Sequence, residues 1–301
     1  MSGAAALGIV ADRLLGEPPS AVHPVVGFGR TMRAVERTIY RDARLPGVTH
    51  ATIGAGLGLA AGALLGSTAV AAWVAVAGRA LGDAALAVAS ALEAGDLPQA
   101  RSLLPALVGR DPSGLDEKEL ARAVVESVAE NTVDAVVAPA LWAALLGAPG
   151  ALGYRAVNTL DAMVGHRSAR YRNYGWASAR LDDAAGWVPA RATAALVAAV
   201  RPATAGAVWT AVRTQAPAHP SPNAGVAEAA FAAALGLRLG GENRYGDRVE
   251  LRPPLGTGRP AEPVDIARAV ALSRDVSLAL GAFLVVKSAC GAKITTRNAP
   301  G

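Results

Sequence analysis

Long uncharged stretches alternate with polar segments along this chain. The longest stretch runs from Ala51 to Gly78, 28 residues without a charged side chain, and a second runs from Ala135 to Tyr154. A helix needs roughly 20 apolar residues to cross a bilayer, so both stretches are long enough. Two weaker stretches follow. The pattern predicts candidate membrane spans near residues 51–78, 135–154, 192–212 and 276–286.

The first stretch carries a regular series of small residues. Glycine recurs at every fourth position, which lets the backbones of two helices approach closely. This spacing predicts tight packing against another helix, although a Gly/Ala helix inside a soluble core is a second interpretation. In the second stretch, two prolines predict kinks. The residues concerned are Gly54, Gly58, Gly62, Gly66, Pro139 and Pro149.

The two weaker stretches are interrupted or short. Residues 192–212 contain Arg201-Pro202 at their middle, which predicts either two helices that meet at a break or one span that carries a charge. Residues 276–286 are too short to cross a membrane unless they end a longer amphipathic helix that begins near Pro263. We therefore expect four or five membrane-embedded helices.

The polar segments suit a membrane surface. Residues from Thr31 to Arg44 carry arginines at helical spacing, which is typical of an interfacial helix, and Asp116 begins a further helix. Strand signals are almost absent, except that Arg248 to Pro253 could form one hairpin with the preceding GENRYGD as its turn. We predict an all-α, polytopic integral membrane protein with amphipathic interfacial helices, folded as a single domain over residues 1–301.

Composition agrees with a membrane protein. The chain is 52% hydrophobic and 18% charged, with a mean hydropathy of +0.31. Its net charge is +5, but the basic residues are scattered and form no basic run, so nucleic acid is not an expected partner. Anionic ligands and membrane lipid are the expected partners. The arginine-rich loops 12–50 and 155–191 are expected on the cytoplasmic side. Cys290 is the only cysteine, which excludes an intrachain disulfide.

Three carboxylates at helical spacing open the candidate site. Glu126, Glu130 and Asp134 stand at i, i+4 and i+8, with Asn131 beside them, so one helix would present all three on one face. Like charges in that register repel, so this face is suited to hold a cation or a cationic substrate group. Alternatively, the carboxylates face solvent or nearby arginines.

Two further motifs carry possible metal ligands. NTLDAMVGHR places Asn158, Asp161 and Gly165 on one helical face, and Asp161 could bind Mg²⁺, cap a helix or pair with an arginine. ARLDD contains the adjacent Asp182 and Asp183, a pair typical of sites for metal and nucleotide but also common at helix starts. Arg191 lies within helical reach of this pair and could bind phosphate.

A proline-rich turn, HPSPN, precedes another apolar helix. Asn223 is its expected N-cap, and the free amides of the helix start could bind a phosphate with His219 and Ser221 close by. Capping alone explains the motif equally well. The chain lacks GxxxxGK[ST], GxSxG and HExxH, so any use of ATP would not follow the P-loop pattern.

The motifs DRLLGEPP, HPVVGFGR, ESVAENTVDAVVAPALW, NTLDAMVGHR, ARLDDAAGWVPAR and HPSPNAGVAEAAFAAALGLRLGG occur in this order from about Gly8 to Ser277. Together they resemble the cobalamin-biosynthesis family CobD/CbiB, the adenosylcobinamide-phosphate synthases. The resemblance implies a multi-pass protein of the cell membrane with its active site facing the cytoplasm. It also implies ATP-dependent amide formation between adenosylcobyric acid and (R)-1-amino-2-propanol phosphate or aminopropanol. A homo-oligomer or other proteins of the cobalamin pathway are possible partners.

The resemblance suggests roles for the polar residues. Mg²⁺ and the substrate ammonium would be held by Glu130, Asp134, Asp161, Asp182 and Asp183. Phosphate charge would be taken by Arg167, Arg191 and His219, and Glu126 is the candidate base for the amine proton. Asn131, Asn158, Ser221 and Asn223 complete the expected substrate site.

Some positions depart from the family pattern. The family usually has Ser, Tyr and Asn where this chain has Ala162, His166 and Gly186, which puts a direct role for these side chains in doubt, and the tail after Ser277 has no counterpart. Two alternatives remain. One is a membrane sensory protein of the branch linked to β-lactamase regulation, against which the intact HPSPN and LDD motifs argue. The other is a cation or corrinoid transporter, which would also place carboxylates in apolar helices.

Overall fold

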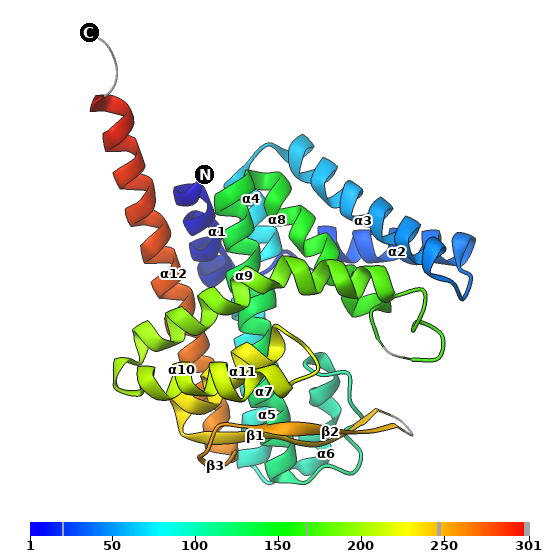
Figure 1. Ribbon diagram of the computed structural model, residues 1–301, viewed down its shortest axis with the longest axis vertical. Helices are drawn as coiled ribbons and strands as arrows, with labels where there is room; N and C mark the ends of the chain where they lie inside the picture. Colours follow the sequence, from blue (N-terminus) through cyan, green and yellow to red (C-terminus); the bar gives the residue numbers. More distant parts are fainter. Residues whose placement is uncertain (20, 167, 246–247, 298–301) are drawn as a thin grey trace. The chain divides into compact units, whose positions relative to one another are not determined.

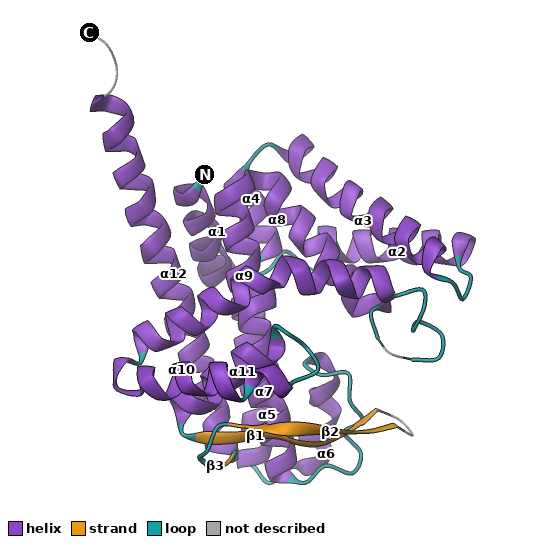
Figure 2. Ribbon diagram, in the orientation of Figure 1, coloured by secondary structure: helices purple, strands orange, loops and turns teal. Residues whose placement is uncertain are grey.

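The computed structural model describes residues 1–19, 21–166, 168–245 and 248–297, and most of them are helical (Figures 1 and 2). Contacts divide the chain into two compact units. Each unit joins segments that are far apart in sequence, a division that the hydrophobic pattern does not indicate. Unit 1 contains Met1–Ala77, Asp134–Gly186 and the chain from Leu280 onward; unit 2 contains Gly78–Val133 and Trp187–Ala279.

Unit 1 is built from helices. It contains α1 (Ser2–Leu15), α2 (Pro24–Ile39), α3 (Arg44–Leu65), α4 (Thr68–Ala75), α8 (Ala138–Val164), the start of α9 (Trp176–Val200) and the end of α12 (Pro263–Arg297). The predicted interfacial helix is α2, but it lies earlier in the chain than the predicted 31–44. His23 begins it, because its side chain accepts a hydrogen bond from Val25 N at 3.2 Å and Pro24 suits the first helical position.

The glycine series of α3 packs against α8, as its spacing predicts. A Cβ on Gly58 would lie 2.5 Å from Ala156 Cβ and 2.7 Å from Leu152 O, and one on Gly62 would lie 2.4 Å from Ala148 O. Backbones this close leave no room for side chains between the helices. Gly66, the fourth glycine, does not take part, since it ends α3 in the left-handed conformation with φ +68°.

Exchanging Gly58 for alanine is expected to loosen this contact. The added methyl group would overlap Ala156, and overpacking of this kind costs about 1–3 kcal/mol. Gly56→Ala on the same helix is the matched control, because a Cβ there meets nothing within 4 Å and alanine favours the helix. Thermal unfolding in one detergent should show a lower midpoint for Gly58→Ala only. Equal midpoints for the two variants would contradict the packing.

The longest predicted span is broken in the structure. Residues 51–78 do not form one helix, because Gly66 ends α3 and Ser67 begins α4, accepting a hydrogen bond from Val70 N. An apolar stretch does not reveal such a break, since its hydropathy is the same on both sides. Residues 192–212 follow the two-helix prediction, and the two helical segments there are bent by 110°. The stretch 276–286 lies within α12, which begins at Pro263 as expected.

Two irregularities shape the helical segment around the second stretch. A π-helical turn, η2 (Val133–Val137), separates α7 (Glu117–Thr132) of unit 2 from α8. Within α8, Gly147 leaves the helical conformation with φ +69°, two residues before Pro149. The predicted kink therefore occurs, but at the glycine, because only glycine adopts that φ at little cost. Pro139 lies in the first turn of α8, where proline is tolerated, and causes no break.

Unit 2 combines helices with a small sheet, so the all-α prediction needs correction. Unit 2 contains α7, the end of α9 and the start of α12. Its other helical elements are α5 (Gly78–Glu93), α6 (Leu97–Leu103), η1 (Leu104–Ala106), η3 (Pro202–Thr204), α10 (Ala205–Thr214), η4 (Ala216–Ala218) and α11 (Ala224–Leu235). Its strands are β1 (Leu237–Tyr245), β2 (Arg248–Leu255) and β3 (Arg259–Pro260). Asp116 starts α7, as predicted, in a capping box with Glu119.

The sheet has the order β2-β1-β3, with β1 and β2 antiparallel and β3 parallel to β1. Most of GENRYGD belongs to β1 rather than to a turn, and residues 246 and 247 lie outside the described residues. The register shifts between Leu239 and Gly241, and Gly240 has φ +86°. Both α7 and α11 pack against β1, and Figure 1 shows β1 and β2 running side by side near α11. The polar groups of β1 therefore lie next to α7.

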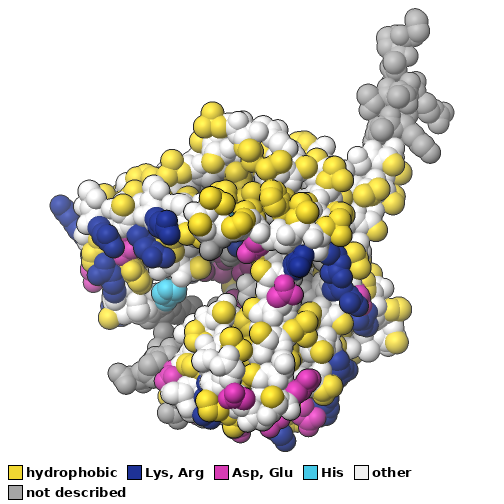
Figure 3. Space-filling view, turned by 180° about the vertical axis from the view of Figure 1, so that it is seen from behind, with side chains coloured by type: hydrophobic (Ala, Val, Ile, Leu, Met, Phe, Trp, Pro, Cys, Tyr) yellow, Lys and Arg dark blue, Asp and Glu magenta, His cyan; other side chains and the backbone are white. Residues whose placement is uncertain are grey.

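Within the described parts of the chain, four helical segments are long and apolar enough to cross a membrane, or five if the bent pair counts as one span: Arg44–Leu65, Thr68–Glu93, Glu117–Val164, Pro263–Cys290 and the pair Trp176–Val200 with Pro202–Ala218. Large hydrophobic side chains are exposed on them, including Leu64, Leu146 and Phe283. Figure 3 shows such side chains over much of the face seen from behind. An exposed apolar surface of this extent suits contact with lipid.

Candidate functional site

Glu126 is a buried carboxylate held by two arginines. Its side chain is 6% exposed, and Oε2 accepts from Arg110 Nη2 at 2.7 Å while Oε1 accepts from Arg122 Nη1 at 3.2 Å. Arg110 is itself 5% exposed. A buried charge needs such partners, because burial without them is very costly. The sequence motifs include Glu126, but neither arginine stands out in the sequence.

The bulge in β1 completes the surroundings of Glu126. Gly240, at the register shift, donates its backbone N–H to Glu126 Oε1 at 2.9 Å. Asn243 Oδ1 accepts from Arg110 and, at 3.1 Å, from Arg122 Nη1, and Arg122 Nη2 donates to Glu242 O at 2.7 Å. The irregular strand thus presents a donor to the carboxylate, and hydrogen bonds from the ion-paired residues join α7 to the sheet.

A second buried polar group surrounds His219. Arg252 Nη1 lies 2.8 Å from His219 Nε2, and His219 Nδ1 lies 3.1 Å from Ser221 O. Because arginine only donates, Nε2 accepts from Arg252, while Nδ1 lies 3.1 Å from both the carbonyl oxygen and the backbone nitrogen of Ser221. Burial lowers the pKa of His219, and the charge of Arg252 adds to this effect, while the hydrogen bond to Ser221 opposes it. The imidazole is therefore held neutral.

This histidine predicts a pH dependence of stability. Its pKa is lower in the folded chain than the ordinary value near 6.5, so the unfolded chain binds more protons and stability rises with pH. The contribution is complete above about pH 6.5 and is lost as the pH falls towards the lower folded pKa. In His219→Gln the melting temperature should fall less between pH 7.5 and 5.5 than in the parent. Parallel pH profiles would contradict this assignment, since the other histidines are common to both proteins.

Glu228 lies beside this group on α11. It is 1% exposed, its Oε1 stands 3.7 Å from both His219 Nε2 and Arg252 Nη1, and its Oε2 has no hydrogen-bond partner. Burial raises the pKa of the Glu228 carboxyl well above its usual range, and the charges of Glu126 and Glu130 add to the effect. At 12 residues, α11 is too short to span a bilayer. The carboxyl therefore adds little negative charge beside Arg252.

The HPSPN motif forms a cap, but with a different residue in the capping role. Asn223 occupies the N-cap position of α11 as predicted, yet its side chain makes no capping hydrogen bond. Instead Ser221 Oγ accepts from the backbone N–H of Asn223 at 3.3 Å and of Ala224 at 3.1 Å. Asn223 Oδ1 accepts from Arg191 Nη1 at 3.1 Å, and Arg191 stacks on the Trp187 ring at 4.4 Å. The structure therefore pairs four of the predicted phosphate-binding residues, Arg191 with Asn223 and His219 with Ser221.

Three of the predicted site residues meet in unit 1, where Asn158 is hydrogen-bonded to both Asp134 and Asp182. Asn158 Nδ2 donates to Asp134 Oδ2 and to Asp182 Oδ1, each at 3.2 Å, and Tyr154 Oη donates to Asp134 Oδ1 at 3.3 Å. Trp142 Nε1, from α8, donates to Ala185 O of α9 at 3.1 Å, which fixes the turn of α9 that carries Asp182. The two carboxylates that share this amide group offer hard oxygen donors, the kind that Mg²⁺ prefers.

The other predicted site residues are placed as follows. Asp161 lies one turn beyond Asn158, and its Oδ1 is 1.8 Å from where a Cβ on Gly165 would stand, so a larger residue at position 165 would displace the Asp161 side chain. Asp183 lies 3.8 Å from Arg180. Asn131 donates to Ser127 O and Oγ, whereas Glu130 is exposed. Arg167 lies outside the described residues.

The predicted single face of carboxylates does not continue through Asp134. The π-helical turn η2 adds about one residue per turn after Thr132, so the i, i+4, i+8 register is lost there. Glu126 and Glu130 belong to unit 2, whereas Asp134 belongs to unit 1. Among the described residues, no group of three or more His, Cys, Asp or Glu side chains could hold a metal by itself.

A family match covers residues 5–273, and the family is described as CobD/Cbib protein. Curated relatives include the cobalamin biosynthesis protein CobD of Mycobacterium tuberculosis, which is 47% identical over 293 residues and covers 93% of each chain. The protein of the same name from Chromobacterium violaceum is 45% identical, covering 88% of this chain and 90% of the relative. That from Geobacter metallireducens is 41% identical, covering 85% and 86%.

The chain belongs to the CobD/Cbib family. The resemblance predicted from the ordered motifs is thereby confirmed. A comparison with solved structures found no match. For this CobD/Cbib chain, the structure adds residues that were not predicted as site residues from the sequence: Arg110, Arg122, Tyr154, Glu228, Asn243 and Arg252. Of these, Arg122 had a usable signal, because it precedes Glu126 by four residues on one helix.

Proposed function

We propose that this chain is a membrane-bound adenosylcobinamide-phosphate synthase. It joins adenosylcobyric acid to (R)-1-amino-2-propanol phosphate, or to aminopropanol, with ATP as co-substrate. Membership of a family whose curated members are named cobalamin biosynthesis protein CobD supports the coarser role, a biosynthetic enzyme that acts on a corrinoid. The ligation itself rests on the resemblance of the motifs and on the chemistry of the polar clusters.

The reaction needs an activated carboxyl group. A carboxylate is a poor electrophile, so the γ-phosphoryl group of ATP is first transferred to an oxygen of the corrin propionate, which gives an acyl phosphate and ADP. The neutral amine then attacks the acyl carbon, a C–N bond forms, the C–O bond to phosphate breaks, and inorganic phosphate leaves. One proton is lost from the ammonium on the way. Catalysis of such steps depends mainly on positioning and on stabilising phosphate charge.

The observation that carries the proposal is the meeting of Asp134, Asn158 and Asp182. These residues come from three of the family-like motifs and share one amide donor. Mg²⁺ in phosphoryl-transfer sites is commonly held by one or two carboxylates, with substrate phosphates completing its shell. The donor set fits that requirement, with Asp161 and Asp183 as the remaining candidate ligands. A bound Mg²⁺ would neutralise phosphate charge there.

In unit 2, the residues suit substrate binding. Arg191, positioned by Asn223 and stacked on Trp187, offers a fixed guanidinium, and His219 and Ser221 border the same turn. Glu126, predicted as the base, has both oxygens engaged by arginines, so we assign it a positioning role in this proposal. The exposed Glu130 is then the better candidate to receive the amine proton.

The apolar helical segments support a location in the cell membrane. We propose that the chain is multi-pass and that the arginine-rich loops, and with them the active site, face the cytoplasm, where ATP is available.

The test is an assay of purified protein in detergent with adenosylcobyric acid, the aminopropanol phosphate and Mg·ATP, followed by mass spectrometry of the corrinoid. The proposal expects an amide product that requires both ATP and the amine. A corrinoid that is bound but never altered, and that crosses proteoliposomes in response to an ion gradient, would overturn the synthase in favour of a transporter.

A further inference from the structure

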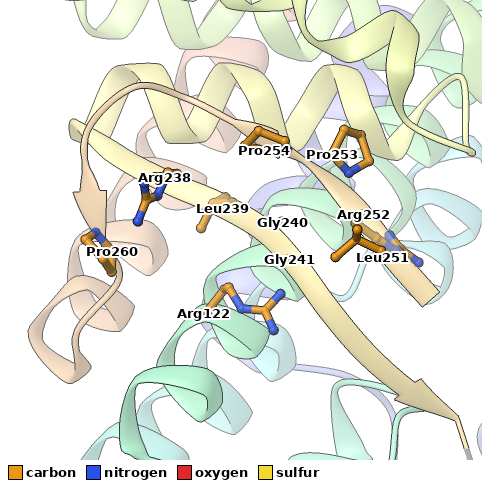
Figure 4. A pocket seen from close by; sticks show the side chains of 10 residues that line it. All are labelled: Arg122, Arg238, Leu239, Gly240, Gly241, Leu251, Arg252, Pro253, Pro254 and Pro260. Carbon is orange, nitrogen blue, oxygen red and sulfur yellow. The ribbon is translucent and has the colours of Figure 1, made fainter. Parts of the chain in front are cut away.

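A pocket of about 590 Å³ lies along the sheet of unit 2. It is lined by three arginines, Arg122 of α7, Arg238 of β1 and Arg252 of β2, together with glycine, leucine and proline residues of the strands. Figure 4 shows Arg122 extending from α7 towards β1 near Gly241, while Arg238 and Arg252 extend from the two strands. This volume is within the range of small-molecule sites, about 300–1,000 Å³.

Two of the arginines are held by groups outside the pocket lining. Arg122 is bonded to Glu126 and to the Glu242 carbonyl, and its Cζ lies 3.9 Å from where a Cβ on Gly241 would stand. Arg252 is bonded to His219 Nε2. Their side chains are 12% and 18% exposed. Arginines fixed in this way lose little side-chain entropy when they bind a ligand.

Arg238 differs from the other two. It is exposed at the rim of the pocket, and the structure shows no ion pair or hydrogen bond of its guanidinium within the described part of the chain. No Asp or Glu is among the residues that line the pocket. A site with three cations and no carboxylate favours an anion without a bound metal, because Mg²⁺ in such sites is held by carboxylates.

We propose that this pocket binds a phosphate monoester, with the phosphate between Arg122, Arg238 and Arg252 and the carbon chain against Leu239, Leu251 and Pro253. The inference rests on the proposed function for the source of the ligand, which is then the amino-alcohol phosphate rather than Mg·ATP. Arg238 belongs to the motif that begins with HPSPN, but none of the three arginines is among the site residues predicted from the sequence, so the pocket assigns them a role of their own.

Arg238→Ala tests the pocket directly. We measure binding of (R)-1-amino-2-propanol phosphate by calorimetry in detergent, without corrinoid or ATP. The expected result is an affinity about tenfold weaker for Arg238→Ala, from loss of one arginine–phosphate contact. Arg213→Ala, an exposed arginine of α10 outside the pocket, is the matched control and should bind as the parent does. Unphosphorylated aminopropanol should bind the parent and Arg238→Ala equally.

A second pair of variants adds a negative charge. Leu251 lines the pocket and is 81% exposed, whereas Val249, two residues earlier on β2 and 52% exposed, does not line it. Leu251→Asp is expected to raise the KM for the amino-alcohol phosphate about tenfold with kcat and the KM for ATP unchanged. Val249→Asp should leave all three unchanged. Because both side chains are exposed, both variants are expected to fold.

The outcomes separate the two claims. Weaker binding in Arg238→Ala without amide formation by any variant supports the pocket and refutes the proposed function. Amide formation with binding and KM unaffected by Arg238→Ala and Leu251→Asp supports the proposed function and overturns the pocket. A change confined to the KM for ATP also overturns the inference, because it would place the nucleotide in this pocket.

Discussion

Glu126→Gln is expected to lower the stability of the folded protein by about 3–5 kcal/mol, because it leaves the buried Arg110 without its counter-charge. The amide keeps the shape of the side chain, so the loss would come from charge and hydrogen bonding rather than from volume. Arg122 and the Gly240 N–H also lose their carboxylate partner. The measurement is the apparent melting temperature in one detergent at pH 7.5.

Glu228→Gln is the matched control for that experiment. Glu228 is equally buried, but one of its oxygens has no hydrogen-bond partner and burial favours its neutral form, so a neutral amide should change stability by less than about 1 kcal/mol. The combination of Glu126→Gln with Arg110→Leu should cost less than the sum of the two single changes, since each removes the same pair. Equal losses in Glu126→Gln and Glu228→Gln would contradict the special role of the ion pair.

Asp134→Asn and Asp182→Asn are each expected to lower the rate of amide formation by about 100-fold or more. Each variant retains a side chain of the same size beside Asn158 but removes one negative charge from the proposed magnesium site. The concentration of Mg²⁺ that gives half of the maximal rate should rise in both. Steady-state assays across a Mg²⁺ series, with the other substrates saturating, measure both effects.

Asp83→Asn is the control for the loss of one surface carboxylate, because the Asp83 side chain is 71% exposed and lies 3.7 Å from Arg79 in an i,i+4 pair. It should behave as the parent protein does. If both Asp134→Asn and Asp182→Asn kept the parental rate and the parental response to Mg²⁺, these residues would not hold the metal.

Local pattern predicted much of the helical fold. The glycines of α3 indicated a close helix contact, which α8 supplies, and Asp116 and Pro263 marked the starts of two helices. The break at Gly66 was not predicted, because a left-handed residue inside an apolar run leaves no trace in hydropathy. The π-helical turn η2 was missed for a similar reason, since it changes the register without changing composition.

Contacts between residues that are distant in sequence could not be predicted from one sequence alone. Arg110 and Asn243 are 133 positions apart, and their meeting depends on how β1 packs against α7. Asp134, Asn158 and Asp182 were each singled out by a motif, but their convergence on one amide group was not. The sheet itself was reduced to a hairpin, because its glycines and prolines weaken the strand signal.

The most direct test of the proposed ligation uses adenosylcobyric acid labelled with ¹⁸O in its free carboxyl group, together with the aminopropanol phosphate and Mg·ATP. An acyl phosphate intermediate transfers one labelled oxygen to the inorganic phosphate that is released, which mass spectrometry detects as phosphate heavier by one ¹⁸O for each amide formed. Unlabelled phosphate, or an amide that forms without ATP, would contradict the proposed mechanism.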